Sequence, residues 1–204
     1  MNFTYHVDDI SKEVSLKGDL AIDTEAMGLN YHRDRLCLLQ LADEVGDIHI
    51  IHFKNRVFDA PHLKTFLTDD SRMKIFHYAR FDVAMIKKYL QISIKNIFCT
   101  KIASKLCRTY TNYHGLSELC NELLEVKISK QHQLSDWGSA NLSQKQLQYA
   151  ALDVKYLHNI RDKMNCMLIR ENKKDIAESC FKFLPVRVKL DLLGWVESDI
   201  FSHS

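Results

Sequence analysis

Acidic residues lie inside apolar segments at three widely separated places in this chain. Asp23 and Glu25 end one apolar run, Asp82 lies in a second, and Asp153 ends a third. A charge in such surroundings is unfavourable unless a partner compensates it. No basic residue lies next to Asp23 or Glu25 in the sequence. The chain must therefore fold so that Asp23 and Glu25 meet a partner that the neighbouring sequence does not supply.

A hard divalent cation is the natural partner, because Mg²⁺ and Mn²⁺ prefer carboxylate oxygen and water as ligands. Four carboxylates gathered from distant segments fit a two-metal site about 4 Å across, which is suited to in-line phosphoryl displacement. We therefore predict two divalent ions, Mg²⁺ or Mn²⁺, held by Asp23, Glu25, Asp82 and Asp153.

The spacings within these segments agree with a shared site. Residues two apart on a strand point to the same face, so Asp23 and Glu25 can both reach one metal cluster. Residues four apart on a helix also share a face, which places Tyr149 beside Asp153. An unperturbed tyrosine has a pKa of about 10 and is a weak base at neutral pH. Either the metals lower the pKa of Tyr149, or its hydroxyl orients a water that the metals have acidified.

From about residue 18 to residue 158, the chain resembles the DEDDy 3′–5′ exonucleases, the ribonuclease D-like branch of the ribonuclease H-like fold. Asp23 and Glu25 match the first motif, Asp82 the second, and Tyr149 with Asp153 the third, and residues 129–137 are similar to the segment before the third motif. The resemblance implies a metal-dependent hydrolase that releases 5′-mononucleotides from the 3′ end of RNA. Many relatives have Asn where this chain has the second-motif pair 77–78, so substrate contacts there are expected to differ.

A closer resemblance is to the nanoRNase C-like subgroup of small bacterial nucleases. Four segments carry it and together span nearly the whole chain: 33–37, 74–77, 99–106 and 190–195. This resemblance implies a substrate of very short RNA, chiefly dinucleotides, and a homo-oligomer, namely an octamer. Two alternatives stay open: a broader ribonuclease D-like exonuclease acting on longer RNA or on DNA ends, and a non-catalytic RNA-binding module. The presence of every motif carboxylate argues against the second alternative.

Several residues near the motifs are candidates for substrate binding. In dinucleotide-degrading relatives an apolar residue after the first motif wedges between the bases, and Leu29 is the candidate here unless it packs in the core. One face of a predicted helix carries Lys101, Ser104 and Arg108, which could hold a terminal phosphate unless that face is merely solvated. His77 and Arg80 lie near Asp82 in the sequence and could contact phosphate or sugar. Tyr110 and Tyr113 could stack on a base or lie on the surface. The candidates are Thr24, Leu29, His77, Arg80, Lys101, Ser104 and Arg108.

Composition bounds the remaining possibilities. A chain of 204 residues with 46% hydrophobic and 26% charged residues suits one soluble domain over residues 1–204. The formal net charge of +2 argues against a broad basic surface for long nucleic acid. Six cysteines without a Cys-x-x-Cys pair favour reduced thiols. No apolar run approaches the ~20 residues of a membrane span, and no export signal is evident, so we expect a cytoplasmic protein.

Pattern and turn signals predict an α/β fold: a mixed five-stranded sheet flanked by helices. The irregular stretch 125–141 is either a solvated loop or an active-site flap, and the apolar segment 181–204 is expected to pack or to form an oligomer interface. Asp59 and Ser143 are predicted to cap helices, the second of which runs past Ile160. Strands are predicted at 20–24, 36–42, 47–53, 73–77 and 97–99, and helices at 62–67, 79–90, 102–106, 116–124 and from 143 onwards.

Overall fold

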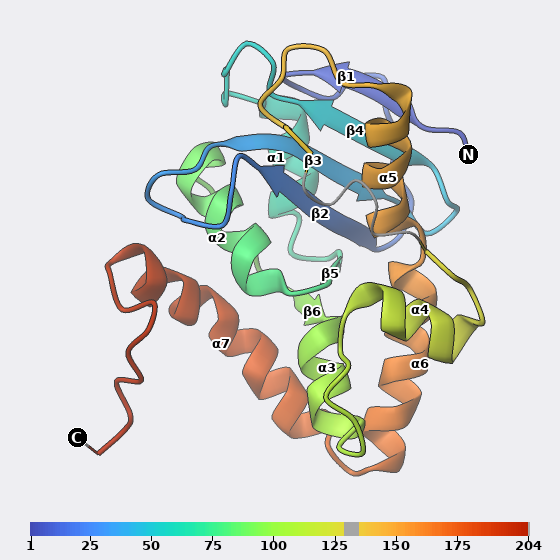
Figure 1. The fold of residues 1–204 in the computed structure, drawn as a ribbon, viewed down its shortest axis with the longest axis vertical. Coiled ribbons are helices and arrows are strands. Elements are labelled where there is room, and N and C mark those ends of the chain that lie inside the picture. Colours follow the sequence, from blue (N-terminus) through green and yellow to red (C-terminus); the bar gives the residue numbers. More distant parts are fainter. Residues whose placement is uncertain (129–134, 204) are drawn as a thin grey trace.

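A mixed sheet lies at the centre of the computed structural model, which describes residues 1–128 and 135–203 (Figure 1). Its strand order is β1-β4-β3-β2-β5-β6. The three strands β2, β3 and β4 form an antiparallel meander, while β1 joins β4, and β5 and β6 extend from β2, in parallel. The strands are β1 (Thr4–Val7), β2 (Leu20–Ala26), β3 (Leu36–Ala42), β4 (Ile48–His52), β5 (Lys74–Phe76) and β6 (Ile97–Cys99).

Helices cover both faces of this sheet. Helix α5 packs on β2, β3 and β4, and Figure 1 shows α1 and α2 behind the sheet in that view. Helices α3, α4, α6 and α7 gather near the β5–β6 end. The helices are α1 (Pro61–Thr68), α2 (Ala79–Leu90), α3 (Thr100–Cys107), α4 (Leu116–Leu124), α5 (Gln144–Lys155), α6 (Leu157–Arg170) and α7 (Lys174–Leu192).

The α/β architecture is as expected, but the sheet has six strands in the described residues and not five. The unpredicted strand is β1, which lies at the edge and pairs only with β4 among the described strands. Tyr5 and Val7 are exposed, so the segment lacks the apolar alternation of a half-buried strand. Its pairing depends on β4, which is more than forty positions away in the sequence.

Two helix starts test the capping predictions. Ser143 caps α5 as expected, and it forms a reciprocal capping box with Gln146. The expected cap of α1 by Asp59 is wrong, because Ala60 occupies that position. The free N–H groups at this end instead donate to the carboxylate of Asp9, which lies far away in the sequence.

The helix predicted to continue past Ile160 is interrupted. Helix α5 ends at Lys155, and α6 begins at Leu157 after Tyr156, whose backbone (φ −105°, ψ 0°) leaves the helical region. The break redirects the chain from the face of the sheet toward α3 and α4 (Figure 1). It therefore separates the segment that carries the third motif from a second helix that serves packing.

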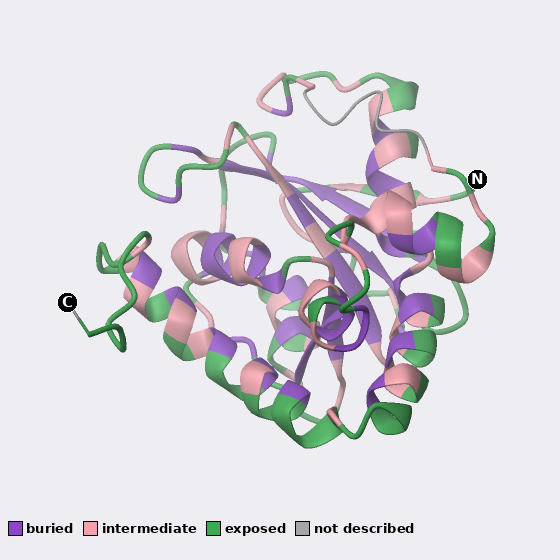
Figure 2. Ribbon diagram, turned by 60° about the horizontal axis from the view of Figure 1, so that its bottom comes forward, coloured by how far each residue is buried: buried purple, intermediate pink, exposed green. Residues whose placement is uncertain are grey.

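The core is continuous from the central strands to the C-terminal helix. Every residue of β3 and β4 is buried, and α7 buries Ala177, Phe181, Leu184 and Val188 along one side while its outer side is exposed (Figure 2). Four of the six cysteines are buried and all six are free thiols. None of the described helices combines the length and apolarity that crossing a membrane requires.

Candidate active site

The acidic residues of the three motifs meet at one end of the central strands. Carboxylate oxygens of Asp23 and Glu25 on β2 and of Asp153 on α5 lie within 4.8 Å of one another. Asp82, near the start of α2, joins them through Thr24, whose backbone N–H and hydroxyl both donate to Asp82 Oδ1, at 2.9 and 2.7 Å. The structure thus brings together side chains that are up to 130 positions apart in the sequence.

The carboxylates of this cluster repel one another when they are ionised. Burial, reinforced by the neighbouring carboxylates, raises the pKa of Asp23 and of Glu25 well above the usual values. Burial raises the pKa of Asp82 and of Asp153 to about 7. Without a compensating cation, the cluster therefore holds protons that isolated carboxylates would lose at neutral pH.

The residues present fit a divalent metal. All four ligands offer carboxylate oxygen, the donor that Mg²⁺ and Mn²⁺ prefer. Among residues 1–128 and 135–203, no lysine or arginine forms an ion pair with any of the four. The charge that would compensate the cluster is thus not supplied by a described side chain.

Tyr149 lies one helical turn before Asp153 on α5, and both side chains line the same pocket. Its hydroxyl donates a hydrogen bond to the Asp153 carboxylate. Burial, followed by the negative charges of Asp153 and Glu25, raises the pKa of Tyr149 far above its ordinary value. The tyrosine is therefore neutral at pH 7 in this metal-free arrangement, and it carries a proton that it can donate in a hydrogen bond.

The carboxylates open into a pocket of about 510 Å³. Leu29 lies at this pocket with 82% of its surface exposed, which excludes the alternative that it packs in the core. Gly28 holds the preceding turn close to Asp34, because a Cβ at Gly28 would lie 2.3 Å from a carboxylate oxygen of that residue. The loop therefore presents an apolar side chain at the site instead of burying it.

A larger cavity, of about 720 Å³, lies between β6, α6 and α7 and contains none of the motif carboxylates.

Two of the candidate phosphate ligands lie elsewhere. Ser104 and Arg108 are buried and do not line the pocket. The Arg108 guanidinium pairs with Glu122 and donates to Ser104 Oγ at 2.9 Å and to the Tyr113 carbonyl at 2.8 Å. The prediction that Lys101, Ser104 and Arg108 share one face available to phosphate is therefore wrong, because Ser104 and Arg108 are buried in an internal network.

Two other candidates also have partners within the protein. Thr24 is buried, and its hydroxyl serves Asp82. Arg80 binds the fully buried carboxylate of Asp191 through two hydrogen bonds, of 2.7 and 2.8 Å, and donates to the Val196 carbonyl. Arg80 therefore ties α2 to the C-terminal end of α7, and it lies outside the pocket that the carboxylates line.

The remaining candidates, His77 and Lys101, do line the pocket. Burial, followed by the charge of Lys101, lowers the pKa of His77 to about 3, so its ring is neutral. The Lys101 ammonium lies 4.4 Å from the ring centroid of Tyr78, within range of a cation–π interaction. Tyr110 and Tyr113 are exposed and do not line this pocket.

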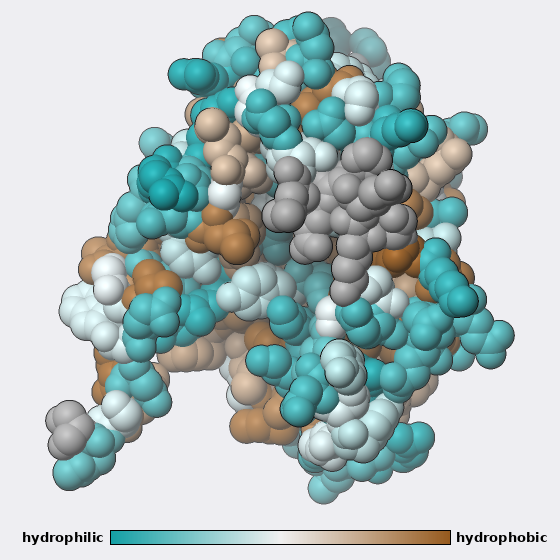
Figure 3. Space-filling view, in the orientation of Figure 1, coloured by the Kyte–Doolittle hydropathy of each residue, from teal (hydrophilic) through white to brown (hydrophobic). Residues whose placement is uncertain are grey.

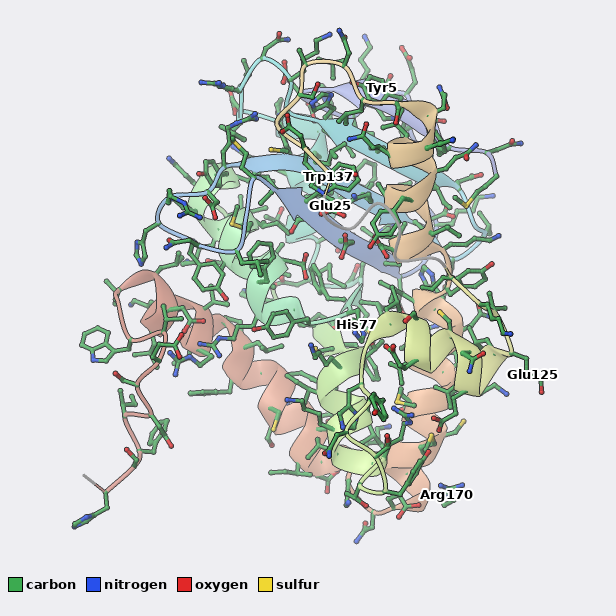
Figure 4. The ribbon with its side chains drawn as sticks, viewed as in Figure 1. Tyr5, Glu25, His77, Glu125, Trp137 and Arg170 are labelled. Atoms are coloured by element: carbon green, nitrogen blue, oxygen red, sulfur yellow. The ribbon has the colours of Figure 1, made fainter. Side chains whose placement is uncertain are left out.

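Sequence reasoning assigned no role to several residues that line the pocket. Trp137 is buried, and its ring lies 6.1 Å from that of Tyr149; Figure 4 shows it in the same part of the molecule as Glu25. The first turn of α4 also lines the pocket, together with Gly115, which precedes the helix and has no side chain to cap it. The segment 129–137 named in the resemblance pointed to Trp137. Of the expected flap at 125–141, residues 129–134 lie outside the described residues, whereas Ile128, Ser135 and Trp137 line the pocket.

Comparison with known proteins identifies the family. A family model described as 3′-5′ exonuclease matches residues 5–169. The chain belongs to the 3′-5′ exonuclease family. It is 28% identical over 160 residues to ribonuclease D of Acidiphilium cryptum, which covers 78% of this chain and 40% of that protein. It is 29% identical over 163 residues to the exosome complex exonuclease RRP6 of Saccharomyces cerevisiae, covering 76% of this chain and 21% of that protein. The chain thus spans less than half the length of these curated exonucleases.

A solved structure within the family is similar over the full length. Brucella melitensis NrnC bound to pGG is 49% identical, has a TM-score of 0.96, and is matched over 100% of both chains. The same protein with bound Mg²⁺ gives 48% identity and a TM-score of 0.94, again over 100% of both chains. The resemblance to nanoRNase C-like exonucleases is therefore confirmed, and it includes the C-terminal helix that lies beyond residue 169.

Proposed function

We propose that this chain is a divalent-metal-dependent 3′–5′ exoribonuclease that hydrolyses very short RNA, chiefly dinucleotides, to 5′-mononucleotides. The convergence of the four motif carboxylates beside Tyr149 in one pocket carries the proposal. Full-length similarity to NrnC bound to pGG supports the substrate class. Membership of the exonuclease family supports the reaction.

Asp23, Glu25, Asp82 and Asp153 would hold two divalent ions, Mg²⁺ or Mn²⁺. Bound ions would polarise the scissile phosphate and lower the pKa of the attacking water. The raised pKa values of the carboxylates mean that metal binding releases protons from the cluster. Metal affinity should therefore increase with pH as Asp82 and Asp153 lose their protons near pH 7.

The protein's own groups position the reactants. Tyr149 lines the pocket one helical turn from Asp153, so we assign its hydroxyl to orienting the attacking water by a hydrogen bond. Thr24 fixes the orientation of Asp82 through two hydrogen bonds. Leu29, exposed at the pocket, would separate the two bases, and Lys101 would contribute positive charge near a terminal phosphate.

The test uses purified protein, Mg²⁺ or Mn²⁺, and 5′-labelled RNAs of two to twenty nucleotides. Dinucleotides should be cleaved with the highest kcat/KM, and EDTA should stop the reaction. Asp153→Asn should abolish cleavage, because it removes a ligand charge with little change in volume. Asp59→Asn is the matched control, since Asp59 is 87% exposed and lies outside the pocket. Full activity of the Asp153 variant would remove this residue from the site.

The length series also decides between the proposal and its main alternative. Equal cleavage of two- and seven-nucleotide RNA would replace the dinucleotide proposal by a broader exonuclease on longer RNA or DNA ends. Similarity to ribonuclease D supports this second reading. Metal-dependent binding without cleavage would instead indicate a non-catalytic RNA-binding module.

We also propose that residues 1–204 act as one domain in the cytoplasm, assembled as a homo-oligomer and specifically an octamer. Apolar side chains on and after α7 are exposed, including Phe183, Val186, Leu193 and Trp195. Figure 3 shows apolar surface where α3 and α7 meet, at the lower centre. Exposed apolar area of this kind favours contact with another subunit. Light scattering that shows an active monomer would contradict the proposal.

A further inference from the structure

His77 lies beside the carboxylate cluster on a neighbouring strand. It directly follows β5, which pairs in parallel with β2, the strand that carries Asp23 and Glu25. All three side chains line the same pocket. Figure 4 shows His77 between the sheet strand of Glu25 and helix α3. A substrate held at the cluster therefore passes close to this imidazole.

Hydrogen bonding fixes which ring nitrogen of His77 carries the proton. The Thr100 hydroxyl donates to the Phe76 carbonyl at 3.1 Å, and a carbonyl oxygen can only accept. A hydroxyl has a single proton, so Thr100 has none left for the ring. His77 Nδ1, which lies 2.9 Å from the same hydroxyl oxygen, must therefore be the donor. The neutral ring is then protonated on Nδ1 and carries its lone pair on Nε2.

Nε2 is consequently a hydrogen-bond acceptor at the substrate pocket. Within residues 1–128 and 135–203, His77 has no hydrogen-bonded partner other than Thr100. His77 Nε2 is not one of the side-chain nitrogens and oxygens that are buried without a hydrogen-bond partner, so it is accessible from the pocket. Burial and the nearby Lys101 keep the ring neutral, with a pKa of about 3. An unprotonated nitrogen cannot donate to a phosphate oxygen, so of the two expected contacts of His77, with phosphate or with sugar, this geometry supports only the contact with sugar.

The substrate must therefore present a donor to His77. Phosphate and ester oxygens have no proton to donate, and base edges lie farther from a scissile phosphate than the sugar hydroxyls do. The 2′-hydroxyl of the 5′ nucleotide is the nearest such donor, because it is on the carbon next to the leaving 3′ oxygen. DNA lacks this group, and the hydroxyl is what allows a protein to distinguish RNA from DNA at one site.

We propose that His77 Nε2 accepts a hydrogen bond from the 2′-hydroxyl of the 5′ nucleotide and is a specificity-determining residue for RNA over DNA. The inference depends on the proposed exoribonuclease function. Thr100 is the positioning residue, because its hydroxyl holds the proton of His77 on Nδ1. One neutral hydrogen bond predicts about a three- to tenfold preference.

The experiment compares kcat/KM for three dinucleotides with Mg²⁺: pGG, pGG with deoxyribose in the 5′ nucleotide, and pGG with deoxyribose in the 3′ nucleotide. Wild-type kcat/KM should fall about three- to tenfold when the 5′ nucleotide carries deoxyribose, and it should stay unchanged when the 3′ nucleotide does. His77→Phe keeps a flat ring but has no acceptor, so it should slow pGG cleavage. The ratio of kcat/KM for pGG to kcat/KM for the dinucleotide with deoxyribose in the 5′ nucleotide should then be close to one. Thr100→Val should also reduce the ratio while the imidazole remains.

A spectroscopic measurement tests the tautomer even if a variant fails to fold. The ¹⁵N chemical shifts of wild-type His77 should show a protonated Nδ1 and an unprotonated Nε2, and Thr100→Val should give a mixture. Equal cleavage of all three substrates by the wild type, an unchanged ratio in folded His77→Phe, or a protonated Nε2 would overturn the inference and leave dinucleotide hydrolysis standing. No cleavage of pGG by the wild type would overturn the proposed function and this inference together.

Discussion

Replacing Asp82 by Asn should make the metal-free protein more stable at high pH. Asp82 is 3% exposed, and burial raises its pKa from 3.8 to about 7. Well below pH 3.8 the carboxyl is protonated in the folded and the unfolded chain, so its ionisation has no effect on stability. As the pH rises to about 7, the unfolded chain loses the proton first, and the folded state becomes progressively less stable. Asn resembles the neutral acid, and its amide oxygen can still accept from Thr24.

The magnitude follows from the two pKa values. A tenfold change in proton affinity is about 1.36 kcal/mol, so the difference between 3.8 and about 7 corresponds to about 4 kcal/mol. In a chain of this size each kcal/mol changes Tm by about 2–4 °C. The metal-free Asp82→Asn variant should therefore match the wild type near pH 4 and exceed its Tm by roughly 10 °C at pH 8.

The assay is differential scanning calorimetry in EDTA from pH 4 to pH 8. Asp59→Asn provides the control, because that carboxylate is exposed and its variant should follow the wild-type curve. Adding Mg²⁺ at pH 8 should raise the Tm of the wild type far more than that of Asp82→Asn, because the ion compensates a charge that the variant lacks. Parallel Tm curves for the wild type and Asp82→Asn across this range would refute the reasoning.

Three further predictions follow from individual contacts. Tyr149→Phe should lower kcat about a hundredfold and leave the Mg²⁺ dependence unchanged, which single-turnover kinetics with a metal titration can check. Leu29→Ala should lower kcat/KM for dinucleotides about tenfold without changing Tm, because the side chain is 82% exposed and supports no core; a loss of Tm would contradict this. Asp191→Asn should reduce the free energy of unfolding by about 3–5 kcal/mol, measured in urea, because it weakens the partner shared by Arg80 and Arg187 in a buried network.

The sequence predicted the central elements and the meeting of the motif residues because local rules govern both. Strand periodicity and the two-residue spacing place Asp23 and Glu25 together, and helical spacing places Tyr149 with Asp153. Ser143 has its capping partner three residues away, so its role was visible in the sequence. Edge strand β1 was not predicted, because its exposed side chains follow no apolar pattern and its partner strand, β4, is distant in the sequence.

The basic candidates show where such reasoning fails. Helical spacing groups side chains on one face but does not say whether that face is exposed. Ser104 and Arg108 share a face that turns toward Glu122 of α4, so the arginine is buried with a partner. Arg80 finds its partner 111 positions away, at Asp191. No pattern in the neighbouring sequence indicates either pairing. Each pairing engages an arginine that the sequence alone suggested as a phosphate ligand.

This contrast has a physical cause that applies to other sites. A basic side chain can be satisfied by any of the 26 acidic residues of this chain, so its sequence neighbours say little about its final partner. Four carboxylates that converge cannot satisfy one another, and their raised pKa values record that conflict. A fold that retains such a conflict needs an external cation to relieve it at neutral pH. Acidic residues in apolar segments therefore predict a ligand site more reliably than basic residues on a helix face do.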